Sequence, residues 1–381
     1  MHLPFCAAKC HYCDFFSVPA EGQDIDAVVD AVLTEARQRA PLHPRTVFVG
    51  GGTPSLLDMT QMRRFLVELD EATRFTSSAS EVTLECNPES LDRDKAALML
   101  DLGVRRLSVG FQSLELDTLK LFGRVHDVDE SFRAYEAARE AGVPDVNIDL
   151  IYASPGHSVE AWRSALSRVL DLAPDHLSAY NLAFEEDTVF SRWLASGKLK
   201  QLDEELELEL FHVTRELTAA RGLQPYEVSN YAHEGRACAH NENYWSNGEY
   251  VGIGPSAVGY VAGARSGNAR GTSSYVQSIR ANGHANAWTE SLEPSARLGE
   301  TWWLGLRRTR GVDPSEARRA AGFTDELDPA IATAETMVGY GLLELDGPRY
   351  RLTAQGLPVA DRIAREFLVV PDAAAEVTER R

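Results

Sequence analysis

The sequence contains few cysteines and has no long apolar run. Only five of its 381 residues are cysteine, and hydrophobic residues make up 44% of the chain. No apolar run is long enough to span a bilayer, and the first residues lack the charged start and apolar stretch of a signal peptide. We therefore expect a cytoplasmic protein without a transmembrane segment, although peripheral contact with a membrane stays open. In that compartment, clustered cysteines are more often metal ligands or catalytic thiols than disulfide partners.

Basic residues are also scarce. Lys and Arg number 38 against 57 Asp and Glu, which gives a formal charge of −19, and they form no block along the chain. A surface of this sign is unfavourable for general binding to phosphates or anionic lipids. We therefore expect no nucleic-acid partner.

Short apolar strands alternate with amphipathic helices in the first half of the chain. A first strand runs into His2 and Leu3, and further strands are predicted at 46–50, 82–85, 106–110, 146–152 and 176–182. The predicted helices between them cover 24–40, 58–72, 91–102, 128–141 and 158–172. About six βα units of this kind predict a parallel sheet that is two units short of a full barrel, with ligands at the carboxyl ends of its strands.

The rest of the chain changes character after Leu182, because an acidic helix at 202–217 and a Gly- and Asn-rich region at 229–274 take over. We predict a core at 1–185, a lid region that completes it at 186–290, a smaller α+β domain at 291–370 and a disordered tail at 371–381.

The smaller domain is predicted to resemble a winged helix, with helices at 293–307, 313–321 and 327–340, a hairpin at 342–353 and a last helix. Segment 325–340, where a recognition helix would fall, has no Lys or Arg to contact phosphates, which argues against DNA binding.

Three cysteines lie together in CAAKCHYC near the start of the chain. One loop can place Cys6, Cys10 and Cys13 around a single metal centre and leave one coordination position open. Thiolate-rich sites suit zinc or iron–sulfur clusters, and a four-iron cluster normally takes four cysteines. The alternative is a closed zinc site that His11 or His2 completes.

Glycine and polar residues stand at the ends of successive predicted strands. GGGTPS follows the strand at 46–50, and its glycines let the backbone approach a ligand, whose carboxylate the N–H groups can hold. Glu85 ends the next strand and Gln112 the one after it. These residues are expected on the face where a barrel places its site. A Gly-rich turn without function is the alternative for GGGTPS.

In this order, the segments HLPFCAAKCHYCDF, GGGTPS, LECNPE, RLSVGFQSL, LFGRVH and NIDLIY resemble the radical S-adenosylmethionine enzymes of the oxygen-independent coproporphyrinogen III oxidase group. The resemblance implies a partial (β/α)6 TIM-like barrel, a [4Fe–4S] cluster and bound S-adenosylmethionine. It implies that Cys6, Cys10 and Cys13 ligate three irons while the cofactor chelates the fourth. Such a site supplies reductive cleavage of the cofactor to methionine and a 5′-deoxyadenosyl radical.

The same resemblance implies further contacts to S-adenosylmethionine. The methionine part is assigned to Gly51, Gly52 and Thr53. The remainder of the cofactor, or a second molecule of it, is assigned to Glu85, Gln112, Arg124 and Asp149. An internal ion pair between Arg124 and Asp149 is the alternative for those two residues.

Within this group the chain resembles the haem-chaperone branch more than the oxidases. The oxidases carry a fourth cysteine two residues after the third, where this chain has Phe15, and an N-terminal extension before the motif. The chaperone branch shows the motif HNxxYW, which the resemblance links to haem binding, and this chain has HNENYW at 240–245.

The side chains of that motif suit a porphyrin. His240 can offer an imidazole to haem iron, while Tyr244 and Trp245 offer flat apolar area. A hydrogen-bonded structural histidine is the alternative for His240. Cys238 is a weaker candidate ligand, and Cys86, inside a predicted strand, is most simply a small core residue.

The resemblance thus implies a haem chaperone that receives haem and delivers it to apo-haemoproteins, with a second copy of the chain as a further candidate partner. The alternatives are oxidative decarboxylation of coproporphyrinogen III and a zinc-stabilised scaffold without redox chemistry. The family pattern reads Tyr-x-His before Pro-Phe-Cys, and Met1 stands in its middle position. We therefore expect the coding sequence to start upstream, with the missing tyrosine in frame.

Overall fold

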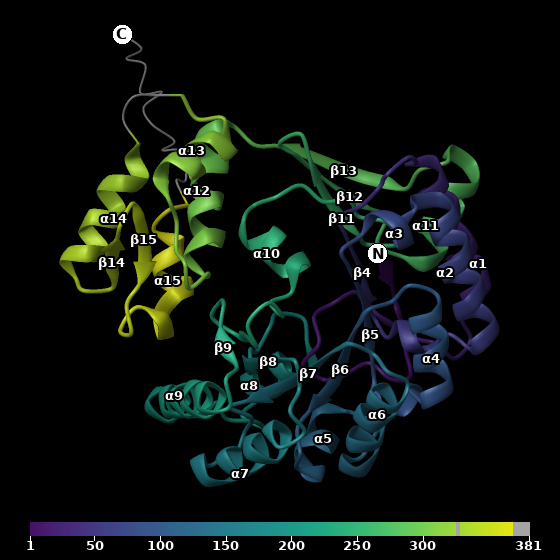
Figure 1. Cartoon of the computed structure of the whole chain (residues 1–381), viewed down its shortest axis with the longest axis horizontal. Helices are drawn as coiled ribbons and strands as arrows, with labels where there is room; N and C mark the ends of the chain where they lie inside the picture. The colour runs from purple at the N-terminus through teal and green to yellow at the C-terminus, as the bar shows by residue number, and fades with distance from the viewer. Residues whose placement is uncertain (325–327, 369–381) are drawn as a thin grey trace.

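A computed structural model describes residues 1–324 and 328–368 (Figure 1). At its centre lies an eight-stranded sheet in the order β1-β4-β5-β6-β7-β8-β10-β9. Its parallel strands are β1 (His2–Leu3), β4 (Thr46–Gly51), β5 (Glu81–Cys86), β6 (Arg106–Gln112), β7 (Asp145–Tyr152) and β8 (His176–Asn181). The antiparallel strands β10 (Asn230–Ala232) and β9 (Gln224–Pro225) extend it beyond β8. The predicted series of parallel strands is confirmed. The predicted tail at 371–381 lies outside the described residues.

Helices between the strands lie along the outer side of the sheet (Figure 1). They are α1 (Ile25–Gln38), α2 (Met59–Thr73), α4 (Arg93–Asp101), α6 (Val128–Glu140), α7 (Val159–Leu170) and α9 (Glu204–Ala220). Five of them begin at a side chain that accepts a backbone N–H of the first turn, as an N-cap does: Asp24, Asp58, Asp92, Asp127 and Ser158. Their ranges lie close to the predicted ones.

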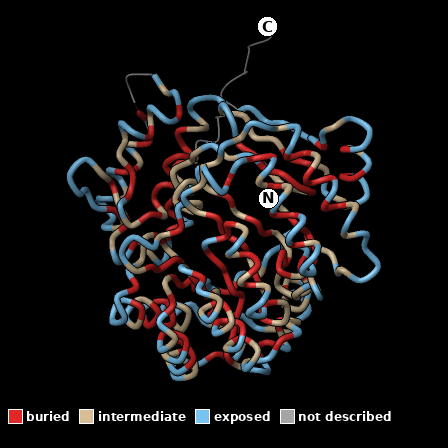
Figure 2. The backbone as a smooth tube through the Cα atoms, turned by 45° about the vertical axis from the view of Figure 1, so that its right-hand side comes forward, coloured by how far each residue is buried: buried red, intermediate tan, exposed pale blue. Residues whose placement is uncertain are grey.

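The two faces of the sheet differ in polarity. On one face, apolar residues occupy every second position of the strands. Val49, Leu84 and Ile148 lie there and belong to the main hydrophobic core. On the other face, polar residues stand in register from β5 to β8, in the row Glu85, Ser108, Asn147 and His176 and in the row Asp149 and Ser178. Figure 2 shows buried backbone along the centre of the molecule and exposed backbone along the outer helices and loops. The inner face therefore carries rows of buried and half-buried polar groups.

The chain beyond β10 forms a helix and a second sheet. α10 (Ala239–Trp245) precedes the antiparallel strands β11 (Val258–Val261), β12 (Ala264–Asn268) and β13 (Asn286–Ser291), and α11 (Thr272–Asn282) packs on α1. The segment between α10 and β11 lies close to β1, because the His2 N–H donates to Ile253 O at 2.8 Å. Gly254 has a φ of +110°, and a Cβ there would lie 2.2 Å from His2 O, so glycine is required. This sheet was not predicted, because its glycines and asparagines favour turns.

The C-terminal elements enclose a separate hydrophobic core. They are α12 (Pro294–Leu306), α13 (Pro314–Ala321), α14 (Pro329–Gly339), β14 (Leu343–Asp346), β15 (Arg349–Leu352) and α15 (Ala360–Arg365). Trp302 stacks on Phe367 in this core, with ring centroids 4.9 Å apart. The helices and hairpin expected here are confirmed, whereas the domain boundaries at 185 and 290 stay predictions. No helix within 1–324 and 328–368 has the length and apolar character needed to cross a membrane.

A buried carboxylate ties α1 to the second sheet and α11. Glu35 is 1% exposed, and its oxygens accept hydrogen bonds from the Gly254 N–H at 3.0 Å, the Asn268 amide at 2.9 and 3.0 Å and the Tyr275 hydroxyl at 2.7 Å. Arg39, one turn further along α1, pairs with the same carboxylate at 2.9 Å. A charge is tolerated inside a protein when such partners replace water. Glu35 is therefore the contact that joins these distant parts of the chain.

We predict that Glu35→Ala lowers the free energy of unfolding by about 3 kcal/mol, because it removes a buried charge and leaves its donors without an acceptor. Urea denaturation followed by circular dichroism measures the change. Glu68→Ala is the matched control, since Glu68 pairs with Arg64 at the surface at 2.8 Å and should cost less than about 1 kcal/mol. Equal losses in the two variants would contradict the role of Glu35.

Candidate functional site

The cysteine loop is held at both ends and in its middle. The parallel strands β2 (Phe5–Cys6) and β3 (Val18–Pro19) bracket it, and it packs on α5 (Leu116–Phe122) and α8 (Val189–Ala195). The His11 N–H donates to Phe122 O at 2.8 Å, and the Phe190 N–H donates to His11 O at 3.0 Å. The Tyr12 ring contacts the rings of both Phe122 and Phe190. The loop is therefore pinned to two helices that the sequence did not predict.

The three cysteines of this loop are free thiols and partly buried. Burial raises the pKa of Cys6 and raises that of Cys13 to about 11. Across residues 1–324 and 328–368, no three His, Cys, Asp or Glu side chains form a group that could hold one metal ion. The donor set, three thiolates on one loop, suits both a zinc ion and a four-iron cluster.

The two histidines considered for a zinc site each contact a backbone carbonyl through one ring nitrogen. His2 Nε2 lies 2.8 Å from Phe16 O, and His11 Nδ1 lies 2.8 Å from Leu121 O. The His11 ring also packs against Trp193, with ring centroids 4.9 Å apart. Burial lowers the pKa of His2 to about 4. Both side chains therefore anchor the cysteine loop through one ring nitrogen each, and the alternative of a closed zinc site stays open.

A chain of hydrogen bonds links two of the thiols to the strand ends. The Thr53 hydroxyl donates to Cys6 Sγ at 3.6 Å and accepts from the Asn87 amide at 2.9 Å. One guanidinium nitrogen of Arg124 donates to Asn87 Oδ1 at 2.6 Å, and the other donates to Cys10 Sγ at 3.5 Å. Arg124 is thus placed to offset the charge of the cysteine loop.

Asn87 was not predicted as a site residue, although it stands in LECNPE, two residues after Glu85. Its polar side chain just beyond the end of β5 was the available signal. Gln112 lies next to the same network, because a Cβ at Gly110 would be 2.7 Å from Gln112 Nε2 and 3.3 Å from Arg124. The structure therefore brings Gln112 and Arg124 together beside the cysteine loop.

The glycines at the end of β4 have contacts within the protein. The Gly51 N–H donates to Glu85 Oε2 at 3.1 Å, and the Gly52 N–H donates to Leu3 O at 2.8 Å. These N–H groups thus donate to Glu85 and β1 in this structure, and the expectation that they hold a ligand carboxylate stays a prediction. A Cβ at Gly52 would lie 2.6 Å from Phe5 O, so close packing against the start of the cysteine loop requires glycine.

Glu85 and Asp149 are half-buried carboxylates on the inner face of the sheet. Burial, together with the charge of Asp149, raises the pKa of Glu85 to about 7. Burial also raises the pKa of Asp149, which accepts hydrogen bonds from Ser108 at 2.9 Å and Asn147 at 2.7 Å. The alternative of an ion pair between Arg124 and Asp149 is wrong, because no such pair occurs among the ion pairs of the described residues and both side chains have other partners.

His240 and Tyr244 stand one turn apart on α10. The His240 ring stacks on Phe48 of β4 at 5.3 Å, and its Nδ1 lies 2.8 Å from the Thr46 hydroxyl. Its Nε2 lies 3.1 Å from the Tyr244 hydroxyl. Burial lowers the pKa of His240 to about 4, so the ring is neutral at pH 7, as a metal-binding imidazole must be.

Predicted cofactor residues and predicted haem residues line one cavity. This cavity has a volume of about 450 Å³, and its walls include Gly51, Glu85, His240 and Tyr244. Phe15, which stands where the oxidases have a fourth cysteine, also lines it. A cavity of about 680 Å³ adjoins His240 on the side of Thr46. Both volumes are in the range of small-molecule sites.

Trp245 faces away from these cavities, toward the C-terminal elements. The Arg307 guanidinium lies over its ring at 4.8 Å, and the neighbouring Ser246 hydroxyl accepts from Arg308 at 2.6 Å. Trp245 lines neither cavity. The structure therefore brings His240 and Tyr244 together but leaves Trp245 as a contact between α10 and the end of α12 (Figure 1).

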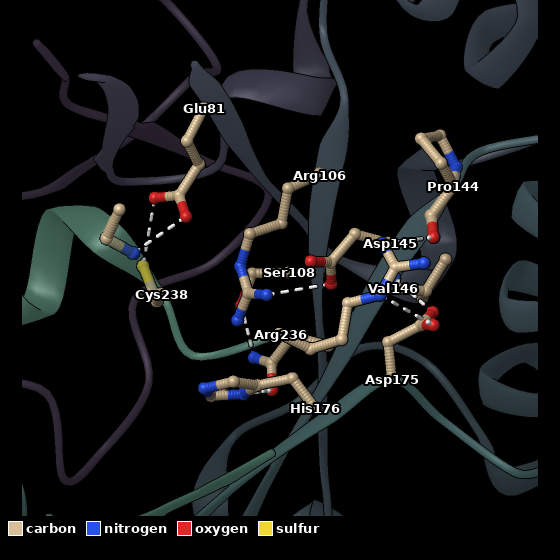
Figure 3. A network of polar contacts seen from close by, with 12 residues as sticks. Glu81, Arg106, Ser108, Pro144, Asp145, Val146, Asp175, His176, Arg236 and Cys238 are labelled. Atoms are coloured by element: carbon tan, nitrogen blue, oxygen red, sulfur yellow. Dashed lines mark hydrogen bonds and ion pairs between the residues drawn. The ribbon is translucent and has the colours of Figure 1, made fainter. Parts of the chain in front are cut away.

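Glu81, at the start of β5, caps α10 (Figure 3). Its carboxylate accepts from the Ala239 N–H at 2.7 Å, the His240 N–H at 3.0 Å and the Cys238 thiol at 3.2 Å. A carboxylate at this end satisfies N–H groups that have no partner within the helix and interacts favourably with its dipole. Burial raises the pKa of Cys238 to about 12, and its thiol donates to Glu81. Sequence reasoning missed Glu81, because 158 residues separate it from Ala239.

We predict that Glu81→Ala loosens α10, because the first turn loses an acceptor worth about 1–2 kcal/mol. Hydrogen exchange measured by mass spectrometry should show faster exchange in a peptide that spans 238–245, and Cys238 should react faster with a thiol reagent. Glu81→Gln keeps one acceptor oxygen and should lie between the wild type and Glu81→Ala. Unchanged exchange in folded Glu81→Ala would refute the capping role.

Comparisons with known proteins agree with this geometry. The model of the radical SAM superfamily matches residues 1–169. The haem chaperone HemW of Bacillus subtilis is 32% identical over 97% of this chain and 98% of its own length. Mitochondrial radical S-adenosyl methionine domain-containing protein 1 of Mus musculus is also 32% identical, over 97% of this chain and 86% of its own. The structure of coproporphyrinogen III oxidase (HemN) from Escherichia coli superposes with a TM-score of 0.82 at 24% identity and covers 97% of this chain and 89% of that one.

Proposed function

Because the chain belongs to the radical SAM superfamily and to the family of the HemW haem chaperones, we propose that it binds haem beside an iron–sulfur cluster and delivers it to apo-haemoproteins. The family implies a [4Fe–4S] cluster and S-adenosylmethionine. Haem as cargo, its delivery to acceptors, a cytoplasmic location and pairing with a second copy belong to the proposal.

The residues of the cysteine loop suit the cluster. Cys6, Cys10 and Cys13 are its ligands in our proposal, and Arg124 offsets their charge through the contact with Cys10. With the cluster bound, S-adenosylmethionine can be cleaved reductively. Gly51, Gly52, Thr53, Glu85, Gln112, Arg124 and Asp149 are proposed to surround that cofactor. Asn87 joins this set, because it connects Thr53 with Arg124.

The observation that carries the proposal is the shared cavity at α10. His240 and Tyr244 line it together with Gly51 and Glu85, so cargo at α10 would lie next to the proposed cofactor site. Phe48 and Tyr250 also line the cavity and offer aromatic surface to a porphyrin. Trp245 enters the proposal as a contact that holds α10 in place and not as a haem contact.

Cluster assembly tests the role of the cysteines. After anaerobic reconstitution, the wild type should contain iron and acid-labile sulfide in equal amounts, and Cys6→Ser, Cys10→Ser and Cys13→Ser should each lose most of both. Cys86→Ser is the matched control, because Cys86 is buried in β5, 3% exposed, and should keep the cluster. Zinc without sulfide in the wild type would refute the cluster and favour the zinc scaffold.

Haem titration of the reconstituted protein tests the cargo. The wild type should show a saturable Soret band, and His240→Ala should bind haem about tenfold more weakly or worse. His212→Ala, on the exposed side of α9, is the control and should bind as the wild type does. Absence of saturable uptake by the wild type would remove the chaperone proposal.

Anaerobic turnover separates chaperone from oxidase. With dithionite, S-adenosylmethionine and coproporphyrinogen III, we expect no vinyl product, because Phe15 replaces the fourth cysteine of the oxidases. Formation of vinyl groups would favour the oxidase activity. The similarity of this chain to the Escherichia coli oxidase is one of fold.

A further inference from the structure

The hydrogen bonds of Thr53, Asn87 and Arg124 form one chain that runs between two proposed cluster ligands. The chain begins at Cys6 Sγ, which lies 3.6 Å from the Thr53 hydroxyl, and ends at Cys10 Sγ, which lies 3.5 Å from the Arg124 guanidinium. Asn87 stands in the middle, and its amide lies 2.9 Å from the Thr53 hydroxyl and 2.6 Å from Arg124. Asn87 therefore links the surroundings of the two sulfurs.

Arg124 fixes the direction of every hydrogen bond in this chain. A guanidinium has donors only, so the side of the Asn87 amide that faces Arg124 must be its oxygen. The amide nitrogen then faces Thr53 and donates to its hydroxyl oxygen. Because a hydroxyl has a single proton, and this oxygen accepts from Asn87, the Thr53 proton is directed to Cys6 Sγ. Both ends of the chain therefore donate to sulfur.

The members of the chain are also held by groups outside it. The Asn87 N–H donates to Ser55 Oγ at 3.2 Å, and Arg124 donates to Gly110 O at 3.0 Å. Thr53 is buried, with 3% of its surface exposed. Donors that are fixed in this way need not reorganise when negative charge develops beside them.

We propose that Asn87 is a positioning residue for the cluster. It turns the Thr53 hydroxyl toward Cys6 and holds Arg124 beside Cys10, and it thereby raises the potential at which the cluster is reduced. Hydrogen bonds to the sulfurs are among the features that set this potential, because they stabilise the added negative charge. One electron enters from the reductant, and no proton has to move. This inference rests on the proposed function, because the cysteines are the cluster ligands proposed there.

A redox titration of the full-length, anaerobically reconstituted chain tests the inference. Dithionite is the reductant, S-adenosylmethionine is left out, and electron paramagnetic resonance follows the reduced cluster. Thr53→Val removes the donor to Cys6 and should shift the equilibrium about tenfold toward the oxidised cluster, which is about 59 mV for one electron. Thr53→Ser keeps the hydroxyl and should retain the wild-type potential. Thr118→Val is the matched control and should retain it too, because the buried Thr118 hydroxyl donates to Glu115 at 2.9 Å.

Asn87→Asp tests whether Asn87 directs the Thr53 proton. A carboxylate only accepts, so it should take the Thr53 proton away from Cys6 while it keeps the contact with Arg124. This variant should have a lower potential than the wild type, and the addition of Thr53→Val should lower the potential no further. An equal shift from Thr53→Val in both backgrounds would overturn the inference.

Two further outcomes separate the inference from the proposed function. An unchanged potential in Thr53→Val would overturn the inference and leave the cluster intact, whereas a wild type without a cluster would overturn both. If Thr53→Val holds no cluster, electron–nuclear double resonance in deuterium oxide replaces the titration. The wild type should then show an exchangeable deuteron coupling that Asn87→Asp lacks, and identical couplings in the two proteins would overturn the inference.

Discussion

The parallel alignment of the strands is the constraint on which the site depends. Parallel strands end at one edge of their sheet, so residues far apart in sequence meet there. The pairing of β1 with β4 sets the glycines at the end of β4 against the start of the cysteine loop. The pairing of β5, β6 and β7 brings Glu85, Gln112 and Asp149 to the same end of the sheet. Backbone hydrogen bonds between the strands thus bring these residues together.

The charged side chains at this edge of the sheet each have their own hydrogen-bond partners. Arg124 contacts Cys10 and Asn87, while Asp149 receives the hydrogen bonds of Ser108 and Asn147. The Arg124 guanidinium therefore lies beside the thiols, while the Asp149 carboxylate lies on the sheet with its own partners. Both kinds of group are therefore available to a cofactor that carries charges of both signs.

The helix α10 depends on contacts at both of its ends. Glu81 of β5 caps its first turn, and Arg307 and Arg308 contact Trp245 and Ser246 at its end. Figure 3 shows that the cap lies next to the Arg106–Asp145 ion pair, which joins β6 to β7. The position of His240 and Tyr244 is consequently determined by the strands and by the C-terminal elements together. A helix of this length has little stability of its own without such contacts.

The sequence by itself determined the parallel strands, most of the helices and the cysteine loop, because hydrophobic period and residue spacing are local properties. It also placed Glu85 and Gln112 at strand ends. Only the tertiary structure decided that Asn87 links Thr53 to Arg124, that Glu81 caps α10 and that Trp245 faces α12. It also decided that Thr46 and Tyr244 occupy both nitrogens of His240. Such pairings join residues up to 194 positions apart, and their geometry arises from packing, which no local pattern encodes.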